Sequence, residues 1–258
     1  MNQVIARART NTNANSVHPV VVTTKYTKSP DTSGWLKVQL EPSGGMVFLP
    51  EFVKVSVIKE DSRTHFMILE GDNKGKTASL KRENAANCLA AASRGNGAKI
   101  VAKTLGRQKL ASRPRHNEVL NQLIATLTFD GQSAMITLDS DVDFKESNPM
   151  SPYYEQIRHS QPLPKGTYRI LAPSVAKRAD FTSFYVTAPG GNPDLKFHTV
   201  WFPIEYAATQ NSNFVHVGNL SEGCVTMYDL TKWNALYKYL ISNRSDKEGK
   251  YVGTVTIE

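Results

Sequence analysis

Residues 214–224 read Phe-Val-His-Val-Gly-Asn-Leu-Ser-Glu-Gly-Cys, and the interpretation of the chain starts from this stretch. An apolar, strand-like run carries His216, and a turn with glycine in front of the sulfur carries Cys224. A thiolate is a strong nucleophile, and a neighbouring imidazole can generate one near neutral pH. The stretch therefore predicts Cys224 as a nucleophile and His216 as its base.

Two further residues of the turn fit the same chemistry. Glycine lets a substrate approach the backbone closely, so the N–H groups of Gly223 and Cys224 are candidate donors to a developing oxyanion. Ser221 is expected to orient the turn or the imidazole through a hydrogen bond. The alternative is structural: a buried histidine in a strand, a cysteine after a turn, and Ser221 as an ordinary turn residue.

The sequence around this stretch predicts strands and one helix. Residues 119–129, the Asp130-Gly131 turn and residues 134–138 have the pattern of a β-hairpin. Residues 229–242 place apolar side chains on one face of a helix. Further strands are expected at residues 166–171, 184–186, 197–206, 213–217 and 251–257.

The first half of the chain predicts a separate small β unit. Short strands are expected at residues 20–24, 35–40, 53–58 and 65–69, which suggests a small β-barrel or SH3-like module. Residues 79–94 have helical spacing and place Cys88 on the apolar face, where it is expected to pack as a small hydrophobe. Residues 1–17 lack any periodicity and are interpreted as a disordered arm.

The fold class that follows is mainly β with a few helices. We expect a basic β module over residues 18–115, which ends in a helical part at residues 99–115, and a second domain over residues 116–258.

The charge is unevenly distributed between the two halves. The whole chain carries a net charge of +8, with +11 in residues 1–115 and −3 in residues 116–258. Such a basic half favours an anionic polymer as partner, most of all at residues 99–115, although a merely soluble basic domain fits equally well.

Other classes of protein find little support. The first residues lack the apolar core of a secretory signal, and no run of 18 apolar residues predicts a membrane span. The two cysteines, Cys88 and Cys224, give no disulfide framework or zinc spacing. Asp139, Asp141 and Asp143 alternate as in a calcium loop but lack its glycine and distal glutamate, so we expect no metal.

Residues 120–258 resemble the L,D-transpeptidase (YkuD-like) catalytic domain. The motif of that family is a strand ending in His-Gly, a loop, and Ser-x-Gly-Cys before an apolar residue. His216-Val217-Gly218 and Ser221-Glu222-Gly223-Cys224-Val225 follow that order. Flanking matches lie at Pro162-Leu163-Pro164-Lys165-Gly166-Thr167-Tyr168, Trp201-Phe202 and Val252-Gly253-Thr254-Val255-Thr256-Ile257.

The chain departs from the family pattern in four places. The interval from His216 to Cys224 is short, and one residue separates His216 from Gly218. Glu222 replaces a common His or Asn, and Thr226 stands where Arg or Asn is usual. The short loop resembles a divergent, toxin-like branch delivered by bacterial secretion systems.

The resemblance implies a C-terminal L,D-transpeptidase-like β-sandwich and a peptidoglycan stem peptide as acyl donor. The acyl group then passes to an amine or to water, and no cofactor is needed. Trp201 and Tyr206 are expected to line the cleft, unless they are plain core, with Gly218 and Thr226 as further substrate contacts. A bacterial protein that stays in the cytoplasm or leaves by a specialised secretion route is expected, with an immunity or secretion partner.

Two other classes stay open. The chain is alternatively a non-catalytic protein whose basic β module binds an anionic polymer. Nucleic-acid binding rests on the basic half alone, since no RNA-binding aromatic motif or helix-turn-helix pattern is found.

Overall fold

The computed structural model describes residues 23–258 except 116, 147–148 and 150. The arm expected at residues 1–17 lies outside the described residues. Within them the fold is mainly β with a few helices, as the sequence predicts. The sheets curl into a half-barrel and a near-barrel.

The N-terminal module, residues 23–90, is built on one antiparallel sheet. Its seven described strands have the order β3-β2-β6-β5-β4-β1-β7. Val38, Val55 and Phe66 are completely buried in its core, together with Cys88, which confirms the packed role predicted for that cysteine. The elements are β1 (Thr23–Thr27), β2 (Trp35–Glu41), β3 (Met46–Pro50), β4 (Lys54–Glu60), β5 (Arg63–Ile68), β6 (Thr77–Lys81), α1 (Arg82–Cys88) and β7 (Leu89–Ala90).

The C-terminal barrel, residues 98–257, holds a mixed sheet of eight described strands in the order β13-β17-β8-β9-β10-β16-β15-β14. A bridge between Ile170 and Ile204 joins its two edges and nearly closes the barrel. The strands are β8 (Ala98–Ser112), β9 (Glu118–Phe129), β10 (Gln132–Asp139), β13 (Gly166–Leu171), β14 (Phe202–Pro203), β15 (Phe214–Val217), β16 (Val225–Met227) and β17 (Tyr251–Ile257). A separate hairpin pairs β11 (Asp143–Lys145) with β12 (Ile157–His159).

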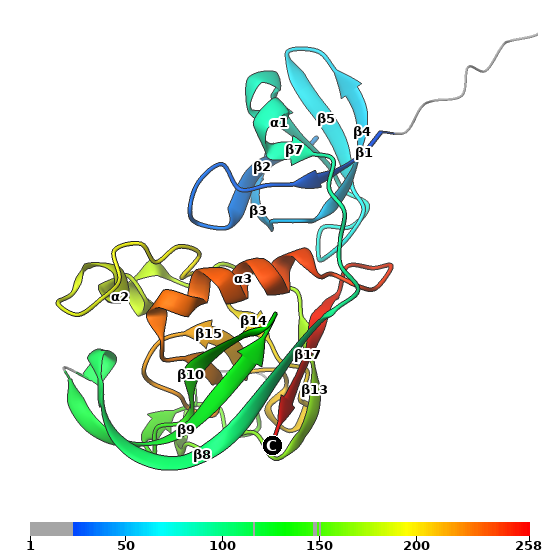
Figure 1. The fold of residues 1–258 in the computed structure, drawn as a ribbon. Helices are drawn as coiled ribbons and strands as arrows, with labels where there is room; N and C mark the ends of the chain where they lie inside the picture. Colours follow the sequence, from blue (N-terminus) through cyan, green and yellow to red (C-terminus); the bar gives the residue numbers. More distant parts are fainter. Residues whose placement is uncertain (1–22, 116, 147–148, 150) are drawn as a thin grey trace, which may run out of the picture.

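Short helices complete the barrel: α2 (Phe184–Thr187), α3 (Trp233–Ser242), and the 3-10 turns Arg113–Arg115, Ala179–Phe181, Ala207–Thr209 and Leu230–Lys232. Helix α3 lies between the N-terminal module and the barrel (Figure 1). Trp233, Leu236, Tyr237 and Leu240 on it are completely buried, which confirms the amphipathic helix predicted there. None of the helices in the described part of the chain has the length and apolarity for crossing a bilayer.

Polar contacts fix the two parts to each other. The Tyr237 hydroxyl donates to Oε2 of Glu51 at 2.9 Å, and the Arg244 guanidinium donates to the Glu51 carbonyl at 3.1 Å. The Phe197 N–H donates to the Thr32 carbonyl at 2.7 Å. The N-terminal module is therefore attached to one side of the barrel by these hydrogen bonds.

Several sequence predictions are corrected. Residues 99–115 are mostly strand β8 of the barrel and not a basic helix of the first module, because Ala98, Ile100 and Ala102 alternate inward while Lys99 and Lys103 face solvent. The division between the two sheets thus falls between β7 and β8, before the boundary expected at residues 115–116.

Three elements also differ in type or length. Residues 184–186 form α2 instead of a strand, since Ser183 and Phe184 carbonyls accept helical hydrogen bonds. The strand expected at residues 197–206 shortens to Phe202–Pro203, and the helix expected at residues 79–94 shortens to α1 because β6 and β7 pair with neighbouring strands on either side of it.

Candidate functional site

The predicted nucleophile and base lie on one face of a parallel strand pair. Strands β15 and β16 pair with His216 opposite Thr226, and Cys224 immediately precedes β16. Because side chains alternate along a strand, His216, Thr226 and Cys224 share the face opposite the core. The alternate residues of the two strands point the other way and are buried in the barrel core: Val215, Val217, Val225 and Met227.

Cys224 is a half-buried residue, and its thiol lies in poorly solvated surroundings. Burial raises its pKa to about 12, a hydrogen bond from the Phe214 N–H works in the opposite direction, and the charges of Glu222 and Lys177 raise and lower it respectively. The Phe214 N–H lies 3.4 Å from Sγ. The sulfur is therefore a neutral thiol near pH 7 in this conformation.

The His216 ring is buried, and both of its nitrogens have partners. Nδ1 donates to the Val217 carbonyl at 2.9 Å, so Nε2 is the acceptor and takes a hydrogen bond from the Thr226 hydroxyl at 3.0 Å. Burial lowers the pKa of His216 to about 4, the Val217 hydrogen bond opposes this shift, and the Lys177 charge adds to it. The ring is thus neutral, with an unprotonated Nε2. Neither nitrogen bonds Cys224 Sγ in the described structure, so a preformed thiolate–imidazolium pair is not present.

An indole and a lysine cover this face. The Trp201 ring stacks on the His216 ring, with centroids 4.0 Å apart and planes inclined by 18°, and meets the Phe214 ring edge-on at 5.7 Å. The Lys177 ammonium lies 4.1 Å from the Phe214 centroid and 5.4 Å from the Trp201 centroid. Trp201 therefore covers the His216 ring, and Lys177 joins it from a loop; a contact of Trp201 with substrate stays a prediction.

The turn before Cys224 is held by hydrogen bonds at each end. The Ser221 hydroxyl donates to the Cys224 carbonyl at 2.8 Å, so Ser221 orients the turn and not the imidazole. The Ser221 N–H donates to Ser140 Oγ, and the Ser140 N–H donates back to the Ser221 carbonyl, both at 2.8 Å. The Asn213 side chain donates to the Gly223 carbonyl at 2.7 Å.

Gly223 is required by this turn for two reasons. Its φ is +102°, a value that other residues rarely adopt, and a Cβ there would lie 2.3 Å from the Gln161 carbonyl oxygen. The N–H groups of Gly223 and Cys224 donate to no other described residue. They are the two donors that the sequence analysis proposed for an oxyanion.

The other predicted substrate contacts lie deeper or further away. Thr226 is completely buried against the His216 ring. Gly218 lies beneath the Tyr185 hydroxyl, which a Cβ at Gly218 would meet at 2.9 Å. The Tyr206 ring packs edge-on against Tyr168, with centroids 5.5 Å apart. In this structure Thr226 and Gly218 position the site, and Tyr206 packs beside strand β13.

Lys177, Asn213 and Ser140 are members of the site that the sequence analysis missed. Each lies in a loop or at the end of a strand with no motif around it. Only the fold brings them together, because Ser140 and Lys177 are far from Cys224 in sequence.

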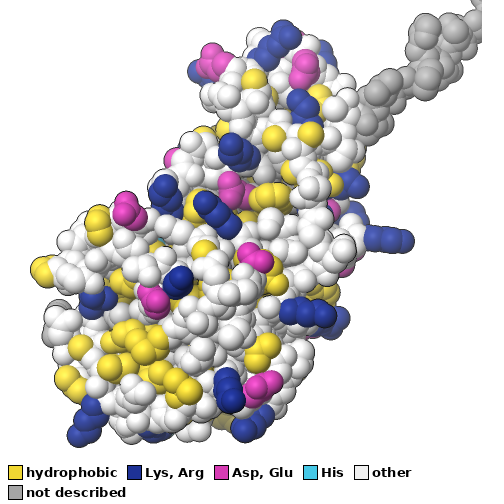
Figure 2. Space-filling view, viewed as in Figure 1, with side chains coloured by type: hydrophobic (Ala, Val, Ile, Leu, Met, Phe, Trp, Pro, Cys, Tyr) yellow, Lys and Arg dark blue, Asp and Glu magenta, His cyan; other side chains and the backbone are white. Residues whose placement is uncertain are grey.

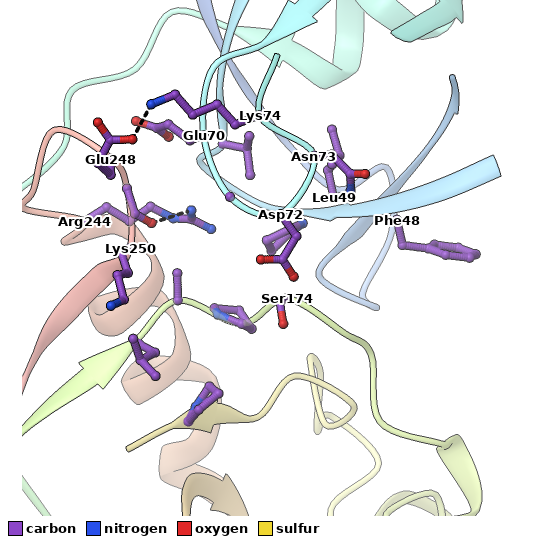
Figure 3. A pocket seen from close by; sticks show the side chains of 18 residues that line it. Phe48, Leu49, Glu70, Asp72, Asn73, Lys74, Ser174, Arg244, Glu248 and Lys250 are labelled. Atoms are coloured by element: carbon purple, nitrogen blue, oxygen red, sulfur yellow. Dashed lines mark hydrogen bonds and ion pairs between the residues drawn. The ribbon is translucent and has the colours of Figure 1, made fainter. Parts of the chain in front are cut away.

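Cys224 does not line either of two cavities of the described structure. One, of about 520 Å³, lies between the N-terminal module and the barrel (Figure 3). Its lining includes Leu49, Lys74, Arg244 and Lys250. The other, of about 430 Å³, is lined by residues that include Asn219, Tyr228 and Asp229.

No group of three or more potential metal ligands is found among the described residues. Comparison of the chain with protein-family models, with curated proteins and with solved structures yields no match.

Proposed function

We propose that this protein is a cysteine-dependent acyl transferase or peptidase of peptidoglycan stem peptides, with L,D-transpeptidase, D-amino-acid exchange or L,D-carboxypeptidase activity. The observation that carries the proposal is one arrangement: the half-buried residue Cys224, an unprotonated His216 Nε2 on the adjacent strand, and N–H groups at Gly223 and Cys224 that donate to no described residue. The sequence resemblance to the L,D-transpeptidases supports the choice of substrate.

The first half-reaction forms a thioester. Cys224 Sγ attacks the carbonyl carbon of the scissile amide while its proton passes to His216 Nε2. The carbonyl oxygen takes the negative charge and accepts hydrogen bonds from Gly223 and Cys224. The C–N bond then breaks, and His216 returns the proton to the leaving amine.

The second half-reaction restores the enzyme. An amine or a water molecule attacks the thioester carbon and gives a proton to His216 Nε2. The C–S bond breaks, and the proton returns from His216 to the departing Cys224 sulfur. An amine acceptor yields a new amide, and water yields a carboxylic acid.

One hydrogen bond must be exchanged before the first step. Nε2 accepts from Thr226, and Cys224 precedes Thr226 by two residues on the same face of the sheet. The thiol proton reaches Nε2 when Nε2 exchanges its Thr226 partner for Cys224. Hydrogen bonds in catalytic sites often tighten in this way only when substrate binds.

The direct test uses purified muropeptides and mass spectrometry of the products. Loss of a terminal residue, exchange for a free D-amino acid, or dimer formation identifies the reaction. Cys224→Ser is expected to abolish product formation, and Cys88→Ala, a change in the core of the N-terminal module, is the matched control that retains it. Equal product from the Cys224→Ser variant would reject the proposal.

The biological setting belongs to the same proposal. A bacterial antibacterial effector, delivered by a specialised secretion route and neutralised by an immunity partner, fits the toxin-like short loop.

Binding of an anionic polymer is a second candidate, and one observation favours it: Lys99, Lys103 and Lys109 are exposed along β8. On the face in Figure 2, however, Lys and Arg side chains are spread over both parts of the molecule among Asp and Glu. Binding to an anionic polysaccharide that weakens steeply with salt, and that Cys224→Ser leaves intact, would support this candidate.

A further inference from the structure

Lys177 holds a positive charge at the candidate site without a carboxylate partner. Its ammonium lies over the faces of Phe214 and Trp201, at 4.1 and 5.4 Å from the two centroids. No ion pair of Lys177 is found among the described residues, whereas the next residue, Arg178, pairs with Asp180. The backbone around it is fixed, because the Lys177 N–H donates to the Thr199 carbonyl at 2.9 Å.

The two rings that hold the ammonium also hold the reacting groups. The Phe214 N–H contacts Cys224 Sγ at 3.4 Å, and the Trp201 ring stacks on His216 at 4.0 Å. An ammonium on an aromatic face keeps its charge while it loses part of its hydration shell. Because Lys177 is half-buried, its field acts on the thiol and the imidazole with less screening than in bulk water.

The sign of that field distinguishes two ways of activating the sulfur. The Lys177 charge lowers the pKa of the Cys224 thiol, which favours the thiolate, and also lowers the pKa of His216, which disfavours the imidazolium. Burial lowers the pKa of Lys177 itself, and the Cys224 charge raises it again. Burial and the Glu222 charge keep the sulfur a neutral thiol near pH 7, and the Lys177 charge lowers the cost of forming the thiolate while it disfavours an imidazolium.

We propose that Lys177 is the electrostatic partner of Cys224: its ammonium stabilises the thiolate and the negative charge that develops during attack, and His216 acts only as a transient proton carrier. This inference rests on the proposed function for its place in catalysis. It assigns to Lys177 the role that a stable imidazolium plays in other cysteine enzymes. Trp201 and Phe214 are then the platform that positions the ammonium.

The test measures alkylation of Cys224 by neutral iodoacetamide as a function of pH, on the full chain, with peptide mass spectrometry to separate Cys224 from Cys88. Lys177→Met keeps the apolar stem on the rings and removes the charge. The Lys177 charge lowers the pKa of Cys224 less than the Phe214 hydrogen bond does, so the pH–rate curve of Lys177→Met should move upward by at most about one unit, with alkylation near neutral pH slower by up to about tenfold. Lys177→Arg should stay near the parent curve.

The matched control is Arg178→Met, which removes one positive charge from the adjacent, exposed position. It is expected to leave the curve in place. A second readout compares anionic iodoacetate with iodoacetamide: their rate ratio should fall in Lys177→Met and hold in Arg178→Met. Lys177→Gln replaces Lys177→Met if circular dichroism shows that the methionine variant is not folded.

Unchanged alkylation in the neutral Lys177 variant would overturn the inference, and so would a Lys177→Arg variant as slow as Lys177→Met, since packing and not charge would then matter. Alkylation needs no peptidoglycan. Failure with muropeptides therefore rejects the proposed function alone, while an unmoved pH–rate curve rejects the role of Lys177 alone.

Discussion

The Thr226 hydroxyl lies 3.0 Å from Nε2 of His216, across the parallel pair of β15 and β16. Because Nδ1 carries the proton that it donates to the Val217 carbonyl, Nε2 has a lone pair and accepts from the Thr226 hydroxyl. The fold therefore supplies the unprotonated nitrogen that a general base needs. Its lone pair is used by Thr226 until another donor replaces that hydroxyl.

Replacing this hydroxyl should destabilise the protein. Thr226→Val leaves a buried Nε2 without a donor, and we expect the free energy of unfolding to fall by about 1–3 kcal/mol in urea denaturation. Thr64→Val is the matched control, because Thr64 is also buried and its hydroxyl has no hydrogen-bond partner in the described structure. That variant should be neutral or more stable. Equal losses in the two variants would show that the His216 hydrogen bond contributes nothing.

A side chain at Gly223 should disrupt the turn. Gly223→Ala combines a φ of +102° with a Cβ placed 2.3 Å from the Gln161 carbonyl oxygen. Gly71→Ala tests the backbone strain alone, since Gly71 has a φ of +71° and open space around it. We expect about 1–2 kcal/mol of destabilisation for Gly71→Ala and clearly more for Gly223→Ala, together with a changed rate of Cys224 alkylation. If Gly223→Ala loses no more stability than Gly71→Ala, the close approach of Gln161 is not a constraint.

The ion pairs of the interface should differ greatly in importance. Arg94 and Glu70 form a pair whose side chains are 11% and 1% exposed. Arg94→Met leaves the buried Glu70 carboxylate without this ion pair and with the Lys54 N–H as a donor, and should cost about 3–5 kcal/mol. Lys74 and Glu248 form an exposed pair, and Lys74→Met should change stability by less than about 1 kcal/mol. Thermal and urea unfolding of both variants measure the difference. Similar small effects would mean that Glu70 finds another partner.

His216 should make the fold sensitive to acid. Its folded pKa of about 4 lies below its unfolded value of 6.5, so the unfolded state binds the proton more readily. The stability is therefore full above pH 6.5 and is lost as the pH falls toward 4, by up to about 3 kcal/mol. Denaturant midpoints of the parent and of His216→Gln, measured between these pH values, should diverge from each other. Parallel curves would contradict a buried neutral imidazole.

His65 should contribute pH dependence of the opposite sign. The ring lies between Glu41, at 2.9 Å, and Asp61, at 3.3 Å, and its pKa is raised mainly by the hydrogen bond to Glu41. A raised folded pKa adds stability below the unfolded pKa, and this stability is lost as the pH rises through the folded pKa. Urea midpoints of the parent should drop as the pH rises above the ordinary histidine pKa of 6.5, and those of His65→Gln should drop less. His159 lies in a similar position between Asp143 and Asp141. The control therefore compares His159→Gln with the double variant His65→Gln/His159→Gln, so that His159 does not contribute to the difference.

Much of the barrel is readable in the sequence. The alternating residues on either side of Asp130-Gly131 pair as β9 and β10, and the apolar face of residues 233–242 packs as α3. These elements are local: a turn residue or a helical period fixes them without help from distant parts of the chain. The helix predicted at residues 99–115 is wrong, because the many basic residues there hide the inward alternation of Ala98, Ile100 and Ala102 that is typical of a strand.

The chain by itself determined that a cysteine follows a glycine turn after a strand that carries a histidine, because those are properties of adjacent residues. Only the tertiary structure decided that Nε2 of that histidine faces Thr226, that Ser140 holds the turn, and that Lys177 lies over Phe214 and Trp201. The reason is physical: strand periodicity selects a face for each side chain, whereas the groups that cover that face come from loops whose paths depend on the closure of the whole barrel.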